Sequence, residues 1–257
     1  PWQQTSVLVG LPGVLTAALF LIVREPPRHG LVKADPKAGV LKFMWARKKT
    51  FYAMIIGFSI FGIAGISYLA WIPAVLIRTH GWDASQVGFT YGAVLLLAAT
   101  PGVLIGGWLS DFLAARGRKD APLYAAIIGL VCSIPFAIAT PLFTDVRWTV
   151  ASLAGFSFFA GVMNSLPATS LQSVSPNQFR AQVTAIYFLI GNLISLAGGP
   201  TIVAAISDAL LGGSQKIGLS LAIVSGVCII LASAILIKTL PHFRASVDEA
   251  QEWQGGH

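Results

Sequence analysis

Long apolar runs without charges constrain this chain more than any other feature of its sequence. A helix needs roughly 20 apolar residues to cross a bilayer core. Seven runs reach about that length with no Asp, Glu, Lys or Arg inside them, namely residues 5–23, 51–77, 88–109, 122–141, 148–171, 181–206 and 217–237. The mean hydropathy is +0.76 and only 11% of residues are charged, which excludes a water-soluble domain. The sequence therefore predicts an all-α polytopic membrane protein with seven transmembrane helices.

The basic residues predict how these helices are oriented. Of the 17 lysines and arginines, all but Arg78, Arg147 and Lys216 fall in one alternating set of connections, which includes residues 24–50. Cytoplasmic loops of membrane proteins carry the excess of Lys and Arg. We therefore expect residues 24–50 and the C-terminus on the cytoplasmic side of a bacterial inner (plasma) membrane. This sidedness explains the net charge of +7, so nucleic acid is not expected as a partner.

The spacing of the spans predicts four parts. Residues 1–23 form a single helix, which we interpret as the last helix of an N-terminal half. Residues 24–50 form a basic cytoplasmic linker, and residues 51–240 form a six-helix transmembrane half. Residues 241–257 form a short, polar and mobile cytoplasmic tail.

The spans lack the residues that several other membrane activities require. The four histidines all lie in loops or in the tail, so no Ser-His pair or metalloprotease motif can form within the membrane. No span carries the lysine of a retinal Schiff base, and nothing indicates the filter or charged ring of a channel. Cys132 and Cys228 lie in apolar runs, where we expect them to be small apolar side chains. We predict no enzyme activity, catalytic residue, metal site or cofactor.

A cluster of small and charged residues follows the third apolar run. It consists of Gly106-Gly107-Trp108-Leu109-Ser110-Asp111 and then Arg116-Gly117-Arg118-Lys119-Asp120. This hairpin resembles motif A of the major facilitator superfamily, whose transporters have two six-helix halves joined by a long cytoplasmic loop. The resemblance implies that residues 1–23 are the sixth helix of such a protein and that residues 51–240 are its C-terminal half.

Three further segments are similar to the spinster-like branch of that superfamily. They are Arg24-Glu25-Pro26-Pro27-Arg28 after Gly10-Leu11-Pro12-Gly13, Trp71-Ile72-Pro73, and Asn192 with Gly198-Gly199-Pro200. The hairpin itself departs from the family pattern in two ways. Phe112 stands where the family usually has a basic residue, and Gly117 and Arg118 lie three residues further along the chain than in the family pattern.

The resemblance implies a conformational latch. In the superfamily, the motif A aspartate faces a helix N-terminus of the opposite half and pairs with an arginine in one conformation only. Asp111 is the corresponding carboxylate here, with Arg116, Arg118 or Arg180 as its partner. The predicted latch residues are Gly107, Asp111, Arg116, Gly117, Arg118 and Arg180. The alternative is that these charges are solvated and only set the topology.

Aromatic and polar side chains within the spans are candidates for a substrate cavity. Phe61, Tyr68 and Trp71 recur at steps of seven and three on one helical face, with Ser67 beside them. Lipid exposure of a polar group at this depth is costly. The candidates are Phe61, Ser67, Tyr68, Trp71, Asn164, Tyr187 and Asn192. Packing and hydrogen bonds between helices are the alternative role for each of them.

Two rows of small residues predict close contacts between helices. Small residues spaced four apart lie on one helical face and let two backbones approach each other. The two rows are Gly191, Ser195, Gly199 and Gly218, Ala222, Gly226.

These features together predict a secondary transporter that works by alternating access. The aromatic, weakly polar lining suggests an amphipathic or lipid-like small molecule, such as the lysolipids or sphingoid phosphates of spinster relatives. An organic anion carrier of a neighbouring branch, which would need buried arginines, and a non-transporting membrane scaffold are the alternatives. Residues for proton coupling are expected in the N-terminal half. The expected partners are the substrate, the lipid bilayer and that half.

Overall fold

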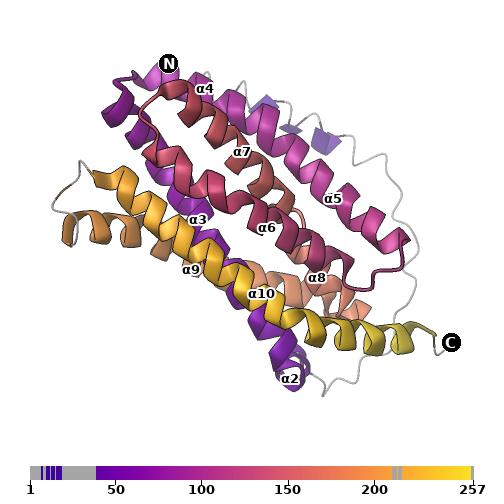
Figure 1. The fold of residues 1–257 in the computed structure, drawn as a ribbon. Helices are drawn as coiled ribbons and strands as arrows, with labels where there is room; N and C mark the ends of the chain where they lie inside the picture. The colour runs from indigo at the N-terminus through magenta and orange to yellow at the C-terminus, as the bar shows by residue number, and fades with distance from the viewer. Residues whose placement is uncertain are drawn as a thin grey trace. The chain divides into compact units, whose positions relative to one another are not determined.

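A computed structural model describes residues 39–209, 213 and 216–255, together with single positions between 7 and 18. Side chains are described up to residue 250. Most of the first predicted span, residues 5–23, and most of the predicted linker therefore lie outside the described residues. Residues 35–257 form one unit, to which the helices in Figure 1 from α2 onward belong.

Six helical segments of this unit are long and apolar enough to cross a membrane. They are Lys48–His80, Ala84–Ala115, Ala121–Leu142, Val146–Ser173, Asn177–Ala209 and Ile217–Ala250. They coincide with the six predicted runs from 51–77 to 217–237, and the described residues contain no strand. The prediction of an all-α membrane protein is confirmed, while most of the remaining predicted span, residues 5–23, lies outside the described residues.

The part of the chain before the first of these spans is helical as well. A short helix, α2 (Val40–Ala46), leads through Arg47 into α3 (Lys48–His80). The ring of Phe43 contacts the rings of Phe51 and Phe179 at centroid distances of 5.4 and 5.3 Å. The end of the predicted linker is thereby packed against the transmembrane helices. At its other end α3 stops at Gly81, whose φ of 68° favours glycine.

The next span changes its helical form halfway along. The side chain of Asp83 and that of Gln86 cap each other's backbone N–H groups at the start of α4 (Ala84–Val94). A π-helical turn, η1 (Leu95–Ala99), then leads into α5 (Thr100–Ala115). Pro101, the second residue of α5, lacks the N–H that a regular α-helix would use at this point. The π-turn and the proline together interrupt the regular helix here.

The third and fourth spans are each composed of two helices. The third contains α6 (Ala121–Ala139) and a 3₁₀ turn, η2 (Thr140–Leu142). The fourth contains α7 (Val146–Asn164) and α8 (Pro167–Ser173). The predicted run 148–171 is thus interrupted after Asn164, and Pro167 begins α8 at a position where its missing N–H costs little.

The last helix corrects the predicted tail. After α9 (Asn177–Ala209), α10 (Ile217–Gly255) continues well past residue 240 instead of ending in a mobile tail. Phe243, Val247 and Ala250 recur at helical spacing and are buried. The segment therefore has an apolar face, which its many polar residues conceal in the sequence. Pro241 lies inside the helix without ending it.

Small residues bring pairs of helices close together. α3 packs against α9 and α10, while α6 packs against α7 and α10 (Figure 1). A Cβ atom added to Gly199 would lie 3.0 Å from the carbonyl oxygen of Ile63, and one added to Gly218 would lie 2.7 Å from that of Pro141. Both predicted rows of small residues therefore mark close helix contacts, as expected.

Candidate functional site

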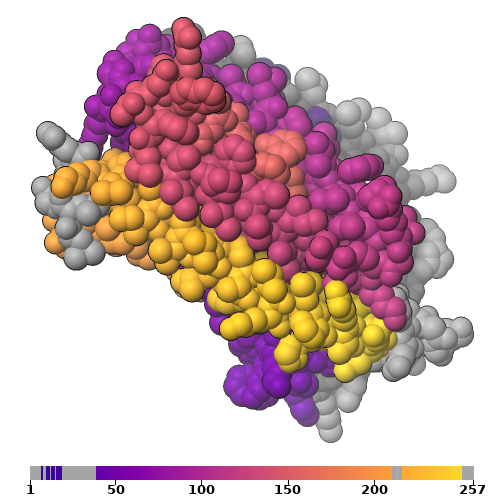
Figure 2. All heavy atoms as spheres, viewed as in Figure 1, coloured from indigo at the N-terminus to yellow at the C-terminus, as the bar shows by residue number. Residues whose placement is uncertain are grey.

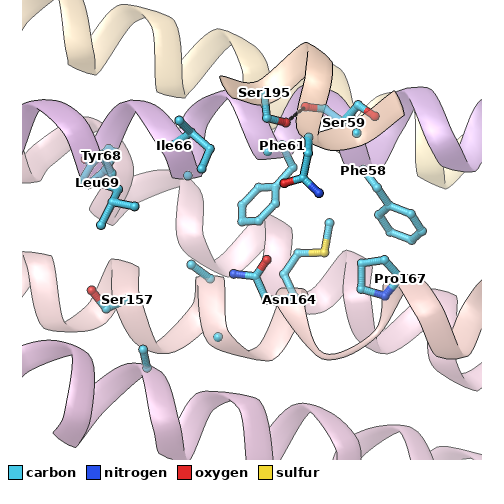
Figure 3. A pocket seen from close by; sticks show the side chains of 18 of the residues that line it. Phe58, Ser59, Phe61, Ile66, Tyr68, Leu69, Ser157, Asn164, Pro167 and Ser195 are labelled. Carbon is cyan, nitrogen blue, oxygen red and sulfur yellow. Dashed lines mark hydrogen bonds between the residues drawn. The ribbon is translucent and has the colours of Figure 1, made fainter. Parts of the chain in front are cut away.

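A cavity of about 390 Å³ lies between α3, the α4–α5 span, α7 and α9 (Figure 3). Its wall combines aromatic rings and backbone at glycines with a few uncharged polar groups. The polar residues that line it are Ser59, Tyr68, Tyr91, Ser157, Asn164, Tyr187, Asn192 and Ser195. No acidic or basic residue is among the described residues that line the cavity.

Five of the seven predicted cavity residues line this space. They are Phe61, Tyr68, Asn164, Tyr187 and Asn192. The other two contact α9 instead. The hydroxyl of Ser67 donates to the carbonyl of Ile63 and lies where α3 meets Gly199.

Trp71 is the second candidate that does not line the cavity. Its indole N–H donates to the carbonyl oxygen of Pro200 at 3.2 Å. Trp71 lies one helical turn beyond Tyr68 along α3, and its polar group binds the backbone of α9. Of the predicted aromatic stripe, Phe61 and Tyr68 therefore line the cavity, whereas Trp71 packs against α9.

Tyr68 presents its ring to the cavity but not its hydroxyl. The hydroxyl donates to the carbonyl oxygen of Ala137 on α6, and the residue is buried. The ring stacks on Phe156 of α7 with a centroid distance of 3.9 Å. Because the hydroxyl is already bonded, Tyr68 contributes an apolar surface to the cavity.

Asn164 has a carboxamide at the break between α7 and α8. In Figure 3 this carboxamide and the ring of Phe61 point into the same space. Asn192 differs because its amide already donates to the carbonyl of Phe188 at 2.8 Å. Interrupted helices within membrane proteins are tolerated where they line a cavity, and this is the situation at Asn164.

The sequence interpretation did not identify Ser59, Tyr91 and Ser195 as lining residues. Ser195 donates its hydroxyl to the carbonyl of Ser59 at 3.2 Å, across the contact of α9 with α3. Tyr91 lies just before the π-turn, on the helix that faces α7. The only available signal was their polarity within apolar runs.

The predicted latch hairpin ends α5 with a specific backbone turn. The N–H of Gly117 donates to the carbonyl of Ala114 at 2.9 Å, and the N–H of Arg118 donates to that of Leu113 at 3.1 Å. Gly117 has a φ of 83°. These two bonds form a Schellman motif, which requires a residue such as glycine at that position. Gly117 therefore has a defined structural role.

Gly107 and Asp111 both face away from the packed helices. An added Cβ on Gly107 would meet nothing within 4 Å, whereas one on Gly106 would lie 2.5 Å from the carbonyl oxygen of Val162. Gly106 is therefore the glycine that allows α5 to approach α7. The side chain of Asp111 is exposed, and among the described residues it has no ion-pair partner.

The three candidate partners of Asp111 are engaged elsewhere. Arg116 lies over the ring of Phe112 at 4.1 Å, and Phe112 stacks on Trp108. Arg180 donates to the carbonyl oxygen of Ser175 at 3.2 Å. Arg118 lies over the ring of Tyr124 at 3.6 Å and binds Asp120. In this conformation, the structure does not bring any of these arginines to Asp111.

Asp120 is the carboxylate that the sequence interpretation missed. Its side chain is only 3% exposed and lies between two arginines. Arg118 Nε donates to Oδ1 at 3.1 Å, and the Arg244 guanidinium lies 2.7 Å from Oδ2. Burial alone would raise the pKa of Asp120, but hydrogen bonds and charge from both arginines outweigh burial and hold that pKa below its ordinary value. Arg244 is too distant in sequence for a local pattern to reveal the pair.

Three further contacts fasten the same part of α10. Lys119 pairs with Asp248, and the Arg47 guanidinium lies 2.8 Å from Oε2 of Glu249. The hydroxyls of Thr50 and Ser246 are 2.9 Å apart. The last turns of α10 thus connect the hairpin before α6 with the start of α3.

The described residues contain no group of three or more His, Cys, Asp or Glu side chains that could hold a metal ion.

Comparison with known proteins places these features in a family. The sequence pattern of the Major Facilitator Superfamily matches residues 1–200. An MFS-type efflux pump of Mycolicibacterium smegmatis is 29% identical, over 91% of this chain and 56% of the pump. A probable galactarate/D-glucarate transporter of Bacillus subtilis is 25% identical, over 76% of this chain and 48% of the relative. Spinster proteins of Drosophila melanogaster and Homo sapiens also match. The chain spans about half the length of the first two relatives.

A solved structure shows the same fold. It is a bacterial homologue of the human lysosomal transporter spinster in an inward-facing, unoccupied conformation. The TM-score is 0.57 at 22% identity, over 96% of this chain and 59% of the other.

Proposed function

We propose that this chain, which belongs to the major facilitator superfamily, supplies the C-terminal six-helix half of a transporter that works by alternating access. The observation that carries the proposal is the uncharged cavity between α3, the α4–α5 span, α7 and α9. An inward-facing relative with the same fold supports it. In this proposal, residues 1–23 belong to the N-terminal half and residues 24–50 are the cytoplasmic linker, so that the C-terminus is also cytoplasmic.

Two spans have exposed faces, and this exposure supports the proposal that an N-terminal half packs against them. The α4–α5 span and α9 are the least covered of the six described spans, with 17% and 22% of the residues in an 18-residue apolar stretch of each buried. Both line the cavity. We propose that the N-terminal half covers these two spans and completes the cavity from the other side.

The chemistry of the wall favours an amphipathic or lipid-like substrate. Phe58, Phe61 and the ring of Tyr68 supply apolar surface, while the Asn164 carboxamide supplies a neutral hydrogen-bonding group. A substrate with an alkyl chain and a polar end matches this division. Any charge on the substrate would need a partner from the N-terminal half, where we also expect the residues for proton coupling.

A test of the cavity uses the complete transporter in vesicles with a fluorescent lysophospholipid as the probe. Asn164→Ala removes one neutral hydrogen bond, and we expect uptake to fall about threefold to tenfold. Asn177→Ala is the matched control, since Asn177 is exposed and does not line the cavity. Equal uptake by the two variants would contradict the role of Asn164. No lysophospholipid uptake by the unmodified protein would contradict the substrate class.

An organic anion carrier is the second candidate, because one relative is named as a galactarate/D-glucarate transporter. Recognition of a carboxylate normally uses arginine. The described cavity residues include no basic residue, so the N-terminal half would have to supply it. Uptake of glucarate by the same vesicles, in place of lysophospholipid, would favour this candidate.

We propose that Asp111 is the latch carboxylate and that its partner lies outside the described residues. The exposure of Asp111 and the engagement of Arg116, Arg118 and Arg180 elsewhere support this arrangement. Asp111→Ala in the complete protein should reduce transport and leave membrane insertion intact. Asp208→Ala is the control, because Asp208 is an exposed aspartate near the end of α9 and, in the predicted topology, lies on the opposite side of the membrane from Asp111. Unchanged transport by the Asp111 variant would refute the latch.

A further inference from the structure

The two faces of α2 differ in chemistry. Phe43 and Met44 face inward, where Phe43 packs on the core and Met44 is 2% exposed. Leu41 and Trp45 lie one helical turn apart on the outer face and are 65% and 63% exposed. Leu41 and Trp45 therefore form a small exposed apolar patch on the outer face of α2.

Three lysines accompany these apolar side chains. Lys42, Lys48 and Lys49 are exposed, and none of them forms an ion pair with a described carboxylate. Lys48 Nζ lies 5.3 Å from the ring centroid of Trp45. Arg47 belongs to the same stretch but pairs with Glu249. Among the described residues, therefore, one cation of this stretch has a carboxylate partner, and three lysines lie beside the exposed apolar residues without one.

The location of this face limits what can cover it. α2 ends at Ala46, two residues before the Lys48–His80 span begins, so the face lies at the level of the headgroups of a bilayer. Trp45 and Tyr52 have ring centroids 5.9 Å apart, and Trp and Tyr are enriched at this level of membrane proteins. Figure 2 shows α2 at the surface, beside the last part of α10.

We propose that the outer face of α2 and the first turn of α3 form a docking surface for anionic phospholipid headgroups. Leu41 and Trp45 enter the boundary between headgroups and acyl chains, and the three lysines bind the phosphates around them. Charge complementarity selects an anionic leaflet over a second protein surface, because the face has three cations and no acidic side chain.

The test measures lipid binding to the complete protein and does not depend on transport. Native mass spectrometry compares bound phosphatidylglycerol with bound phosphatidylcholine for the triple variant Lys42→Gln, Lys48→Gln and Lys49→Gln. We expect the preference for phosphatidylglycerol to fall by about fivefold per lysine. The control triple variant replaces Arg78, Arg147 and Lys216 with Gln, which removes the same charge from the other ends of the spans. Equal losses in the two variants, or no loss in either, would overturn the proposal.

A second measurement locates the apolar contact. Tryptophan fluorescence of the protein in vesicles with brominated phosphatidylglycerol should include a quenched component that disappears in Trp45→Phe. The same variant in brominated phosphatidylcholine should show a smaller change. If Trp45 is shielded from both brominated lipids, the N-terminal half or another protein surface covers this face and the proposal is wrong.

Discussion

Replacing Asp120 with asparagine tests whether the last turns of α10 hold the hairpin in place. The substitution Asp120→Asn would keep the shape of the side chain but not its charge, so both arginines would lose their counter-ion. Removing one member of a buried ion pair costs about 3–5 kcal/mol. Arg118 and Arg244 have side chains that are 33% and 52% exposed, and solvent therefore compensates part of that loss. We expect a decrease of about 2 kcal/mol in the free energy of unfolding.

The control for this substitution is Asp248→Asn. Asp248 and its partner Lys119 are 52% and 53% exposed, and a pair of that kind contributes about 0–1 kcal/mol. Both variants remove one aspartate charge from the same end of the protein, so they differ mainly in burial. Equilibrium unfolding of the complete protein in mixed detergent micelles gives the two free energies.

A double-mutant cycle then assigns the effect to the contact itself. Arg244→Gln should destabilise the unmodified protein and should have little further effect when Asp120→Asn is already present. The reasoning is refuted if Asp120→Asn costs no more than Asp248→Asn. It is also refuted if the two substitutions of the pair are additive.

Three other expectations follow from the same structure. Gly161→Ala should lower the free energy of unfolding by about 1–3 kcal/mol, because the added Cβ would lie 2.4 Å from the carbonyl oxygen of Ala99. Gly92→Ala is the control: its added Cβ would meet nothing within 4 Å, so it should be neutral or stabilising in the same unfolding assay. Because the pKa of Asp120 is lowered, the stabilisation that its carboxylate provides is complete above the ordinary pKa of about 4 and is lost as the pH falls through the lowered value. The free energy of unfolding should therefore decrease less in acid for Asp120→Asn than for the unmodified protein when it is measured against pH. Tyr68→Phe should lower the free energy of unfolding by only about 0.6 kcal/mol, because it removes one interhelical hydrogen bond, to the carbonyl of Ala137, and keeps the ring stacked on Phe156. A decrease above about 2 kcal/mol in the same unfolding assay would contradict this account.

The positions of the described spans could be predicted from the sequence because apolar runs and loop charges are local signals. The six runs from 51–77 onward match the observed helices, and the small residues at 191, 195 and 199 mark a real contact. The packed end of α10 could not be predicted in this way. Its apolar residues Phe243, Val247 and Ala250 are separated by charged ones, and they become a face only once the helix continues past Pro241.

The cavity was partly predictable for a related reason. Polarity within an apolar run identified Asn164, Tyr187 and Asn192, but polarity alone does not show which way a side chain points. Ser67 and Trp71 satisfy their hydrogen bonds on their own helix or on α9, and so they do not line the cavity. The contribution of Tyr91 depends on how the α4–α5 span lies against α7, which its own sequence does not show.

The ion pair between Arg118 and Asp120 makes Arg118 a poor candidate for the partner of Asp111. For Arg118 to reach Asp111, it would have to leave a carboxylate that is 3% exposed and give up its position over Tyr124. Phe112 occupies the position at which the family usually has a cation, and Arg116 lies on that ring. The hairpin therefore holds its own arginines in place while Asp111 stays exposed. Under the proposal that Asp111 is the latch carboxylate, its positive partner or a helix N-terminus must therefore come from the N-terminal half, and Asp111 is then a point of contact between the two halves.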